Sequence, residues 1–374
     1  MRILVGDILQ SKSQTLINTV NCVGVMGKGI ALEFKSRFPD MYEDYVKRCE
    51  QGEVKLGVPY LYKTLFPPQI VNFPTKDHWK SISRLSDIER GLQYLLEQYQ
   101  AWGVASLAIP PLGCGNGQLE WRVVGPLIYR FAKKMTIPVE IYAPYGTRPK
   151  ELTVEFLEHG LGAHTDQTVK NGQAALNPAW VALVEIIARI EQQPYHWPIG
   201  RTLFQKIAYV ATNDGLPTGL RYQRGSFGPF SEDLKSVEAK LINNGLLQEE
   251  RRGKMFMVKA GPNYDRVRQK YGSFFERWTD TLEKSADLFM RVNTDQAEVI
   301  ATVLFAAREL EQEKHETPSE TTVLDAVMHW KQKRRPPLDQ HTVASTIRNL
   351  ATLKWLTVKA DPKLPVPEEE AIPA

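Results

Sequence analysis

The chain has 374 residues, a formal net charge of +4 and the 43% hydrophobic and 24% charged composition of a soluble globular protein, and its length predicts two or three domains. Its three cysteines follow no disulfide-framework or zinc-ligand spacing, and no apolar run reaches the ~20 residues of a membrane span. Because the first residues also turn polar too early for a signal peptide, we expect a cytoplasmic protein with no membrane partner and no metal.

Residues 1–155 alternate between strand-like and helix-like segments, which indicates an α/β domain with a largely parallel or mixed sheet covered by helices. Prolines are expected to end two of the strands, at Pro74 and at Pro110. This part holds 19 basic and 15 acidic side chains, which weakly favours an anionic ligand. The predicted strands are Arg2–Val5, Leu16–Val20, Gln69–Phe73, Val104–Ile109 and Val139–Ala143, and the predicted helices are Ile30–Arg37, Pro39–Cys49, Ile88–Trp102 and Val123–Lys134.

The remaining residues follow a different pattern. Residues 156–178 contain turn formers without a clear period, which predicts a linker. Residues 179–360 show helical spacing, and two similar units place a helix before a turn and a short strand, which is typical of winged-helix folds. Residues 361–374 hold four prolines and three glutamates and are predicted to be disordered. The two units are Val237–Leu247, followed by Glu249–Lys254 and Met255–Val258, and Val343–Leu356, followed by Thr357-Val358.

A loop with three glycines connects the second predicted strand to the helix that follows it. The segment from Asn18 to Ala31 reads NTVNCVGVMGKGIA. Glycines let backbone N–H groups approach phosphate oxygens closely, and the following helix adds the partial positive charge of its N-terminus. Asn21 offers an amide to sugar hydroxyls. The spacing matches neither the dinucleotide-binding fingerprint nor a Walker A loop.

A second glycine loop, Pro110–Leu119 (PPLGCGNGQL), also follows a strand and precedes a helix. Two such loops at the same end of one sheet could hold a diphosphate from both sides. Asp7 follows the first strand directly, in Gly6-Asp7-Ile8, where its carboxylate could accept a hydrogen bond from an adenine amine. Aspartate is also a common turn residue after a strand, so this motif alone is a weak signal.

These motifs resemble the macrodomain family. Within it, Phe73–Lys80 (FPTKDHWK) is similar to the DarG antitoxins, whose branch also contains the terminal ADP-ribose protein glycohydrolase. The resemblance implies an α/β macrodomain with a mixed sheet between helices over residues 1–155, followed by a mainly helical, winged-helix-like C-terminal region. The motifs that carry it are Gly6-Asp7-Ile8, Asn18-x-x-Asn21, Gly24-x-Met26-Gly27-x-Gly29-Ile30-Ala31 and Pro111-Leu112-Gly113-Cys114-Gly115.

The resemblance implies an antitoxin hydrolase that cleaves the N-glycosidic bond of ADP-ribosylated thymidine in single-stranded DNA. It would thereby reverse the modification made by a DarT-like toxin, and its C-terminal half would bind that toxin. ADP-ribose is then product or ligand, and no cofactor is implied. Asp7 and Ile8 would hold the adenine, and Asn21 would face the distal ribose. The predicted ADP-ribose-binding residues are Asp7, Ile8, Thr19, Asn21, Gly24, Met26, Gly27, Lys28, Gly29, Ile30, Leu112, Gly113, Cys114, Gly115, Asn116 and Gly117.

Cleavage of this bond passes through a transition state with oxocarbenium character. In the related protein glycohydrolase a lysine attacks the sugar and an aspartate in the second glycine loop assists, but here Gly117 stands at the aspartate's place and the nearest carboxylate is Glu120. We predict Lys80 as the catalytic lysine, with Lys76 as the alternative; the structural alternative for both is a solvated loop lysine. Catalysis by His78 or by the loop cysteines is less favoured.

Two features of the C-terminal half could contact nucleic acid. Arg221–Phe230 mixes arginines with aromatic residues, and Lys331–Arg335 is a basic run. Each also has a structural explanation, as an ordered loop and as a solvated helix end. Because this half is neutral overall, a protein partner fits better, and glutamates such as Glu298 and Glu309 could imitate DNA for a toxin.

Two other functions stay open. The chain could be a non-catalytic ADP-ribose reader joined to a winged-helix DNA-binding regulator, which the glycine at position 117 favours. It could also be a hydrolase that acts on ADP-ribosylated protein carboxylates. Comparing protein and DNA substrates would separate the second alternative from the DNA-directed hydrolase.

Overall fold

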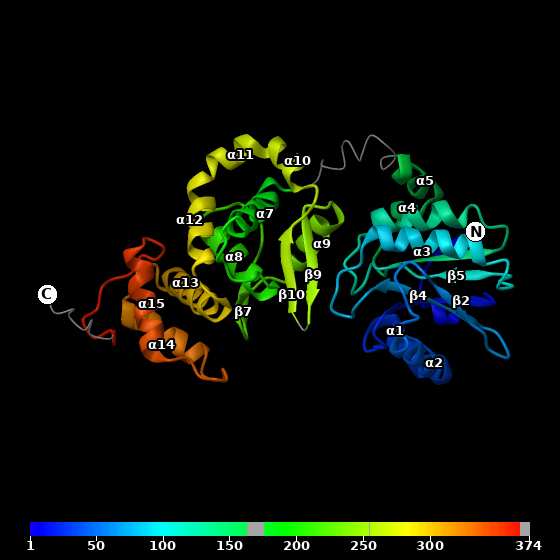
Figure 1. The fold of residues 1–374 in the computed structure, drawn as a ribbon, viewed down its shortest axis with the longest axis horizontal. Helices are drawn as coiled ribbons and strands as arrows, with labels where there is room; N and C mark the ends of the chain where they lie inside the picture. Colours follow the sequence, from blue (N-terminus) through cyan, green and yellow to red (C-terminus); the bar gives the residue numbers. More distant parts are fainter. Residues whose placement is uncertain (163–175, 254, 367–374) are drawn as a thin grey trace. The chain divides into compact units, whose positions relative to one another are not determined.

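The computed structural model describes residues 1–162, 176–253 and 255–366, and the chain divides into two compact units, Met1–Ala175 and Leu176–Ala374 (Figure 1). The helices of the N-terminal unit are α1 (Gly29–Arg37), α2 (Pro39–Glu50), α3 (Leu85–Gln98), α4 (Trp121–Ala132) and α5 (Val154–Gly162), with short 3-10 turns η1 (Ile8–Gln10) and η2 (Pro149–Leu152). Its strands are β1 (Arg2–Val5), β2 (Thr15–Asn21), β3 (Tyr60–Tyr62), β4 (Gln69–Lys76), β5 (Leu107–Ile109) and β6 (Val139–Ala143).

The six strands of this unit form one mixed sheet in the order β1-β6-β5-β2-β4-β3. All neighbouring pairs are parallel except β3 with β4, which are antiparallel. Successive residues of a strand point to opposite faces of the sheet, so Leu16 packs with α1 and α2, whereas Ile17 packs with α3 and α4. The sheet thus lies between two layers of helices, as the sequence predicts, and Figure 1 shows the two layers.

Strand β4 continues past Pro74 to Lys76, so the prediction that this proline ends the strand is wrong. β3 pairs only with residues 70–72 of β4. The missing N–H of Pro74 therefore costs no hydrogen bond to β3, which is the condition under which strands tolerate proline. The register between β2 and β4 shifts just after the pair of Val20 with Pro74. The extension places Lys76 at the carboxyl end of the strand.

The N-terminal unit extends beyond residue 155, where the linker is predicted to begin. Helix α5 packs against α4, and Leu157 is fully buried, so residues 156–162 belong to the N-terminal unit. Residues 163–175 of the predicted linker lie outside the described residues, and residues 176–178 belong to the C-terminal unit, where Leu176 is buried in the core and a helix begins at Pro178. In the predicted tail, Leu364 is buried in the core of the C-terminal unit, which contradicts disorder at that point, and residues 367–374 lie outside the described residues.

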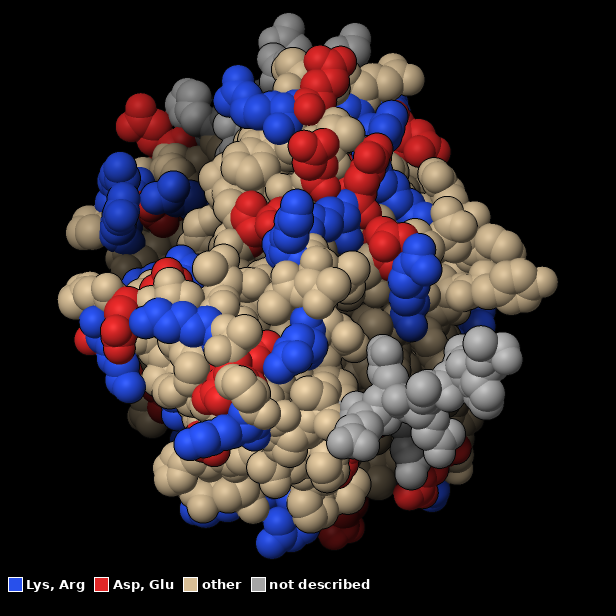
Figure 2. Space-filling model, turned by 90° about the vertical axis from the view of Figure 1, so that its left-hand side faces the viewer, with Lys and Arg blue, Asp and Glu red and all other residues tan. Residues whose placement is uncertain are grey.

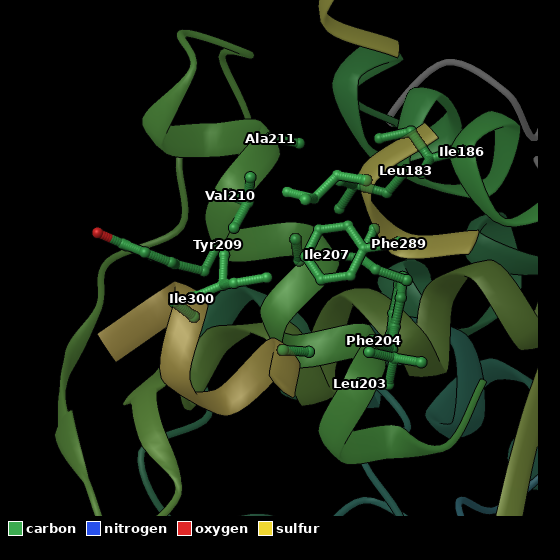
Figure 3. Packing of buried hydrophobic residues seen from close by; sticks show 14 of the residues in the cluster. Leu183, Ile186, Leu203, Phe204, Ile207, Tyr209, Val210, Ala211, Phe289 and Ile300 are labelled. Carbon is green, nitrogen blue, oxygen red and sulfur yellow. The ribbon is translucent and has the colours of Figure 1, made fainter. Parts of the chain in front are cut away.

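The C-terminal unit is mainly helical and has its own core. In Figure 3, Leu183 and Ile186 of α7 lie on the side of Phe289 of α12, and Ile300 of α13 lies beside Tyr209 of α8. Its helices are α7 (Pro178–Glu191), α8 (Arg201–Asn213), α9 (Asp233–Asn243), α10 (Tyr264–Arg268), α11 (Gly272–Arg277), α12 (Thr279–Met290), α13 (Thr294–Lys314), α14 (Glu320–Trp330) and α15 (Gln340–Thr352), with a 3-10 turn η3 (Gln269–Tyr271). Two antiparallel hairpins complete it, β7 (Gln223–Gly225) with β8 (Gly228–Phe230) and β9 (Leu247–Arg252) with β10 (Met255–Ala260).

The two units predicted as winged-helix repeats differ in the structure. In the first, α9 leads into the β9–β10 hairpin. In the second, α15 is followed by a single isolated bridge between Ser319 and Lys359 instead of a strand pair. The winged-helix assignment stays a prediction. Among the described residues, no helix is long and apolar enough to cross a membrane.

Candidate functional site

Three loops meet at the carboxyl ends of the neighbouring parallel strands β5, β2 and β4. They are the first glycine loop after β2, residues 77–83 after β4, and the second glycine loop after β5. The backbone N–H of Cys22 donates to the Asp77 carbonyl at 3.2 Å, and that of Ser83 donates to the Gly117 carbonyl at 3.0 Å. Residues 77–83 are therefore hydrogen-bonded to both glycine loops, at the sheet edge where open α/β folds bind ligands.

Asn21, the last residue of β2, shapes the first glycine loop. Its amide nitrogen donates to the Val25 carbonyl at 2.5 Å, and its amide oxygen accepts hydrogen bonds from the Val23 N–H at 3.0 Å and the Tyr45 hydroxyl at 3.1 Å. These bonds fold the chain tightly before α1 begins. The predicted contact of Asn21 with a ribose stays a prediction beside this structural role.

The two glycine loops face each other across the N-terminus of α1. Gly29, the first residue of α1, has a φ of +59°, and a Cβ there would lie 3.4 Å from the amide nitrogen of Asn116 in the second loop. The residue before it, Lys28, makes no side-chain capping hydrogen bond. The first N–H groups of α1 and the positive end of its dipole thus lie beside the second loop, an arrangement suited to phosphate oxygens.

The second glycine loop leaves no space for a side chain at Gly117. A Cβ at this position would lie 2.3 Å from the Ser83 hydroxyl oxygen and 2.4 Å from the Gly113 carbonyl oxygen. Gly113 itself has a φ of +73°. Position 117 is therefore closed to any side chain in this loop conformation, and Glu120 lies beyond it as the residue before α4.

Lys76 links residues 77–83 to the second glycine loop through its ammonium group. The Nζ atom donates to the carbonyls of Asn116 at 2.8 Å, Ser81 at 3.2 Å and Trp79 at 3.5 Å. Each of these three carbonyl oxygens accepts a hydrogen bond from the ammonium group. Lys76 therefore lies in the site, where its hydrogen bond to Asn116 connects the end of β4 to the second glycine loop.

Lys80 lies at the exposed side of the same segment, beside the Trp79 ring. The Lys80 ammonium is 4.8 Å from the centre of that ring, and the rings of His78 and Trp79 are stacked with centroids 5.4 Å apart. The backbone N–H of Lys80 donates to His78 Nδ1 at 3.1 Å, which fixes the turn. Both predicted lysines are thus brought to the site, but in different surroundings.

Asp7 begins a turn at the carboxyl end of β1. Its carboxylate accepts hydrogen bonds from the Leu9 N–H at 2.9 Å and from the Gln10 amide at 3.4 Å, which is the turn role that aspartate often has after a strand. Asp7 is exposed and Ile8 is buried beneath it. The adenine contact of these two residues stays a prediction.

Comparison with known proteins identifies the N-terminal fold. Residues 17–128 match the family of the Macro domain. The N-terminal unit is a macrodomain. The chain is 38% identical over 245 residues to a DNA ADP-ribosyl glycohydrolase of Thermus aquaticus, and the match covers 64% of each chain, just under two thirds of the relative's length.

Two further similarities concern the macrodomain itself. A DNA ADP-ribosyl transferase–DNA ADP-ribosyl glycohydrolase fusion protein of Thermosipho africanus is 44% identical over 161 residues, which are 38% of this chain and 42% of the fusion protein. The solved macrodomain of Thermus aquaticus DarG is 45% identical, with 38% of this chain and 97% of that chain covered and a TM-score of 0.37.

The other predicted ligand residues of the macrodomain differ in their exposure to solvent. Met26 and Leu112 are buried and support the loops from beneath, and Thr19 and Ile30 are half-buried. Burial raises the pKa of the Cys114 thiol to about 12, which keeps it protonated at neutral pH and argues against a thiolate nucleophile. The predicted residues that are exposed on the loops are Gly27, Lys28, Gly29, Gly115 and Asn116.

Sequence reasoning missed how residues 77–83 join the two glycine loops of the macrodomain. The joining groups are mostly backbone atoms, such as the Asp77 carbonyl and the Ser83 N–H, which leave no mark in the amino-acid sequence. The sequence also indicates Lys76, the last residue of β4, only as an alternative nucleophile and not as the residue that joins this segment to the second glycine loop. Among the described residues, no three His, Cys, Asp or Glu side chains are grouped so as to hold a metal ion.

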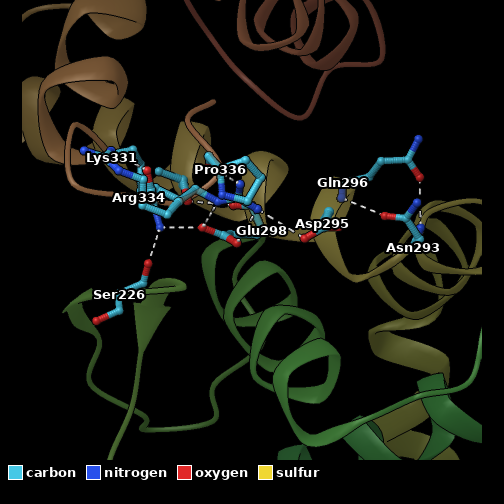
Figure 4. A network of polar contacts seen from close by, with 10 residues as sticks. Ser226, Asn293, Asp295, Gln296, Glu298, Lys331, Arg334 and Pro336 are labelled. Carbon is cyan, nitrogen blue, oxygen red and sulfur yellow. Dashed lines mark hydrogen bonds and ion pairs between the residues drawn. The ribbon is translucent and has the colours of Figure 1, made fainter. Parts of the chain in front are cut away.

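The two basic features of the C-terminal unit lie together in one polar network (Figure 4). The Lys331 ammonium donates to Glu298 at 2.6 Å and to the carbonyl of Ser226, between β7 and β8, at 2.8 Å. Arg224 of β7 donates to Glu309 at 2.9 Å. This favours the structural explanation for both features. Because Glu298 is buried, the hypothesis that it imitates DNA is wrong for this residue.

Figure 2 views one face of the molecule, on which lysines and arginines alternate with aspartates and glutamates. No large patch of a single charge covers that face. Such a distribution differs from the continuous basic stripe of a generic nucleic-acid-binding surface.

Proposed function

We propose that the chain is a hydrolase that removes ADP-ribose from nucleobases of single-stranded DNA, with thymidine as the modified nucleoside. One observation carries the proposal: a lysine segment, residues 77–83, is hydrogen-bonded to both glycine loops of a macrodomain. The 38% identity over 245 residues to a DNA ADP-ribosyl glycohydrolase supports the choice of DNA over protein as substrate.

In this proposal the diphosphate of ADP-ribose lies between the glycine loops. The N-terminus of α1 and the backbone N–H groups around Gly29 would hold it from one side, and those around Gly115 from the other. Asp7 and Ile8 would contact the adenine, and the distal ribose would point toward residues 77–83. The short span from Gly29 to Asn116 supports this placement.

Lys80 is proposed as the residue that acts on the distal ribose. Its amine would attack the anomeric carbon, the bond from that carbon to the base nitrogen would break, and the base nitrogen would keep the electron pair and take up a proton. Water would then cleave the new carbon–nitrogen bond, releasing ADP-ribose and restoring the lysine. Lys80 is preferred to Lys76 because three carbonyl oxygens already accept hydrogen bonds from the Lys76 ammonium.

We further propose that the chain counteracts a DNA ADP-ribosyltransferase toxin and binds it through the C-terminal unit. The Thermosipho relative joins a DNA ADP-ribosyl transferase and a glycohydrolase in one polypeptide, which supports a paired function of the two activities. The neutral, mainly helical C-terminal unit with its own core supports a role in binding a protein.

The test is release of ADP-ribose from a single-stranded oligonucleotide that carries ADP-ribosyl-thymidine. The full chain and its Lys80→Ala and Lys76→Ala variants are compared, together with an ADP-ribosylated protein as the second substrate. We expect release from DNA by the wild type, loss of at least a hundredfold in rate for Lys80→Ala, and ADP-ribose binding retained by that variant. Binding of ADP-ribose without release by the wild type would make the macrodomain a reader, and release from protein alone would change the substrate.

A further inference from the structure

Trp79 is an exposed aromatic residue inside the proposed active site. Trp79 is 47% exposed, whereas Trp121, which packs in the macrodomain core, is only 7% exposed. The Trp121 indole N–H donates to the Glu151 carbonyl at 3.1 Å, so that residue has a clear structural role. The core does not explain Trp79 in the same way, because much of its ring surface faces solvent.

The Trp79 ring is nevertheless held in place. The His78 ring stacks against it at an interplanar angle of 28°. Asp77 accepts a hydrogen bond from the His78 N–H at 2.8 Å, and His78 Nδ1 accepts one from the Lys80 N–H at 3.1 Å, so the backbone on both sides of Trp79 is fixed. A ring that is both exposed and positioned beforehand loses little conformational freedom when a flat ligand stacks on it.

The Trp79 ring lies close to the residue that is proposed to act on the ribose. The Lys80 ammonium lies 4.8 Å from the centre of the Trp79 ring. The Trp79 carbonyl also accepts from Lys76, which binds Asn116 of the second glycine loop at 2.8 Å. A group that stacks on Trp79 would therefore lie next to Lys80 and close to the loops assigned to the diphosphate.

The chemistry of this surface fits an unpaired nucleobase. An aromatic ring with a cation beside it is the combination that stacks on bases and attracts the neighbouring phosphates of single strands. An ADP-ribosylated glutamate or aspartate has a small carboxylate as its leaving group, with no aromatic ring to stack on an indole. Trp79 therefore offers a means to prefer nucleic acid over protein, which the glycine loops, common to ADP-ribose binding in general, do not supply.

We propose that Trp79 is the stacking platform for the nucleobase that carries the ADP-ribose, and that it sets the preference for a DNA substrate. This inference rests on the proposed function, since it assigns the base to the site in which Lys80 reacts. It adds a binding subsite for the leaving group, next to the sugar and diphosphate subsites.

The test uses the full chain with Lys80→Ala, so that the substrate is bound without being cleaved. Into this background Trp79→Phe, which keeps a ring, and Trp79→Leu, which keeps an apolar side chain without one, are introduced. Dissociation constants are measured for the ADP-ribosylated oligonucleotide and for free ADP-ribose. We expect Trp79→Leu to weaken oligonucleotide binding at least tenfold and Trp79→Phe less than threefold, with ADP-ribose binding unchanged within twofold for both.

Equal losses for the oligonucleotide and for ADP-ribose would overturn the inference, because Trp79 would then only shape the ADP-ribose pocket. Unchanged oligonucleotide binding by Trp79→Leu would overturn it as well. Failure of the proposed function has a different signature, since the chain with Lys80 intact would then release no ADP-ribose from DNA whatever the binding measurements give.

Discussion

Gly117 shows how the backbone of one residue limits the chemistry of the site. A Cβ there would lie 2.3 Å from the Ser83 hydroxyl oxygen and 2.4 Å from the Gly113 carbonyl oxygen, whereas a Cβ at Gly115 would meet nothing within 4 Å. We expect Gly117→Ala to lower the free energy of unfolding by about 1–3 kcal/mol, the usual cost of overpacking, and Gly115→Ala to lower it by less than about 0.5 kcal/mol.

Urea unfolding of the two glycine variants measures this difference, and ADP-ribose affinity is measured in parallel. A Gly117→Ala protein as stable as the wild type would mean that the second loop can move away from Ser83. The loop would then have room for a carboxylate side chain at position 117, and loop geometry would not explain why this chain has glycine there.

Lys76 is proposed to position the loops and not to react with the sugar. Its replacement should therefore affect stability and ADP-ribose binding. Lys76→Met keeps the length of the side chain but removes hydrogen bonds to three carbonyls. Hydrogen bonds from a charged group stabilise by about 1.5–3 kcal/mol, so we expect a loss of unfolding free energy of this order and weaker ADP-ribose binding. Lys80→Met is the matched control, for which calorimetry should show ADP-ribose affinity close to that of the wild type.

At the scale of elements, the sequence predicts best what is decided locally. The glycine loops and the N-terminus of α1 were found because glycine and helix starts act over a few residues. The end of β4 was missed because the tolerance of Pro74 depends on where a neighbouring strand stops. Helix α5 was missed because it is stabilised by packing on α4, and residue 157 carries no sign of that contact in the sequence.

Helix α9 carries a buried acid whose titration should affect stability. Burial raises the pKa of Glu238 to about 8, with the Arg201 charge opposing the shift and that of Glu249 adding to it. The folded state then keeps a proton that the unfolded state releases above its ordinary pKa of about 4.3. The stabilisation is complete below that value and is lost as the pH rises toward 8.

The neutral variant Glu238→Gln is the control for this effect, because other groups also titrate over this range. Unfolding free energies of the wild type and the variant are compared at pH 5 and pH 8. From pH 5 to pH 8 the wild type should lose more unfolding free energy than the variant does. We expect this difference to be at least about 1.4 kcal/mol, the equivalent of one pKa unit. An identical pH dependence of the two proteins would show that Glu238 ionises normally in the folded state.

At the scale of the whole molecule, the two units have separate hydrophobic cores, and the proposal gives them separate ways to oppose a toxin. In this proposal removal of ADP-ribose is catalytic, so one molecule of the chain would repair many sites. Capture of the toxin is stoichiometric, so protection stops once the toxin exceeds the chain. The two mechanisms are therefore distinguished by their dependence on concentration.

Titrating expression of the full chain against a fixed amount of a DNA ADP-ribosyltransferase toxin tests this division. The wild type should protect cells at a small fraction of the toxin concentration. Lys80→Ala should protect only when it is equal to or above the toxin, because its C-terminal unit still binds. If Lys80→Ala gives no protection even in excess, the C-terminal unit does not capture the toxin, and neutralisation depends on the macrodomain alone.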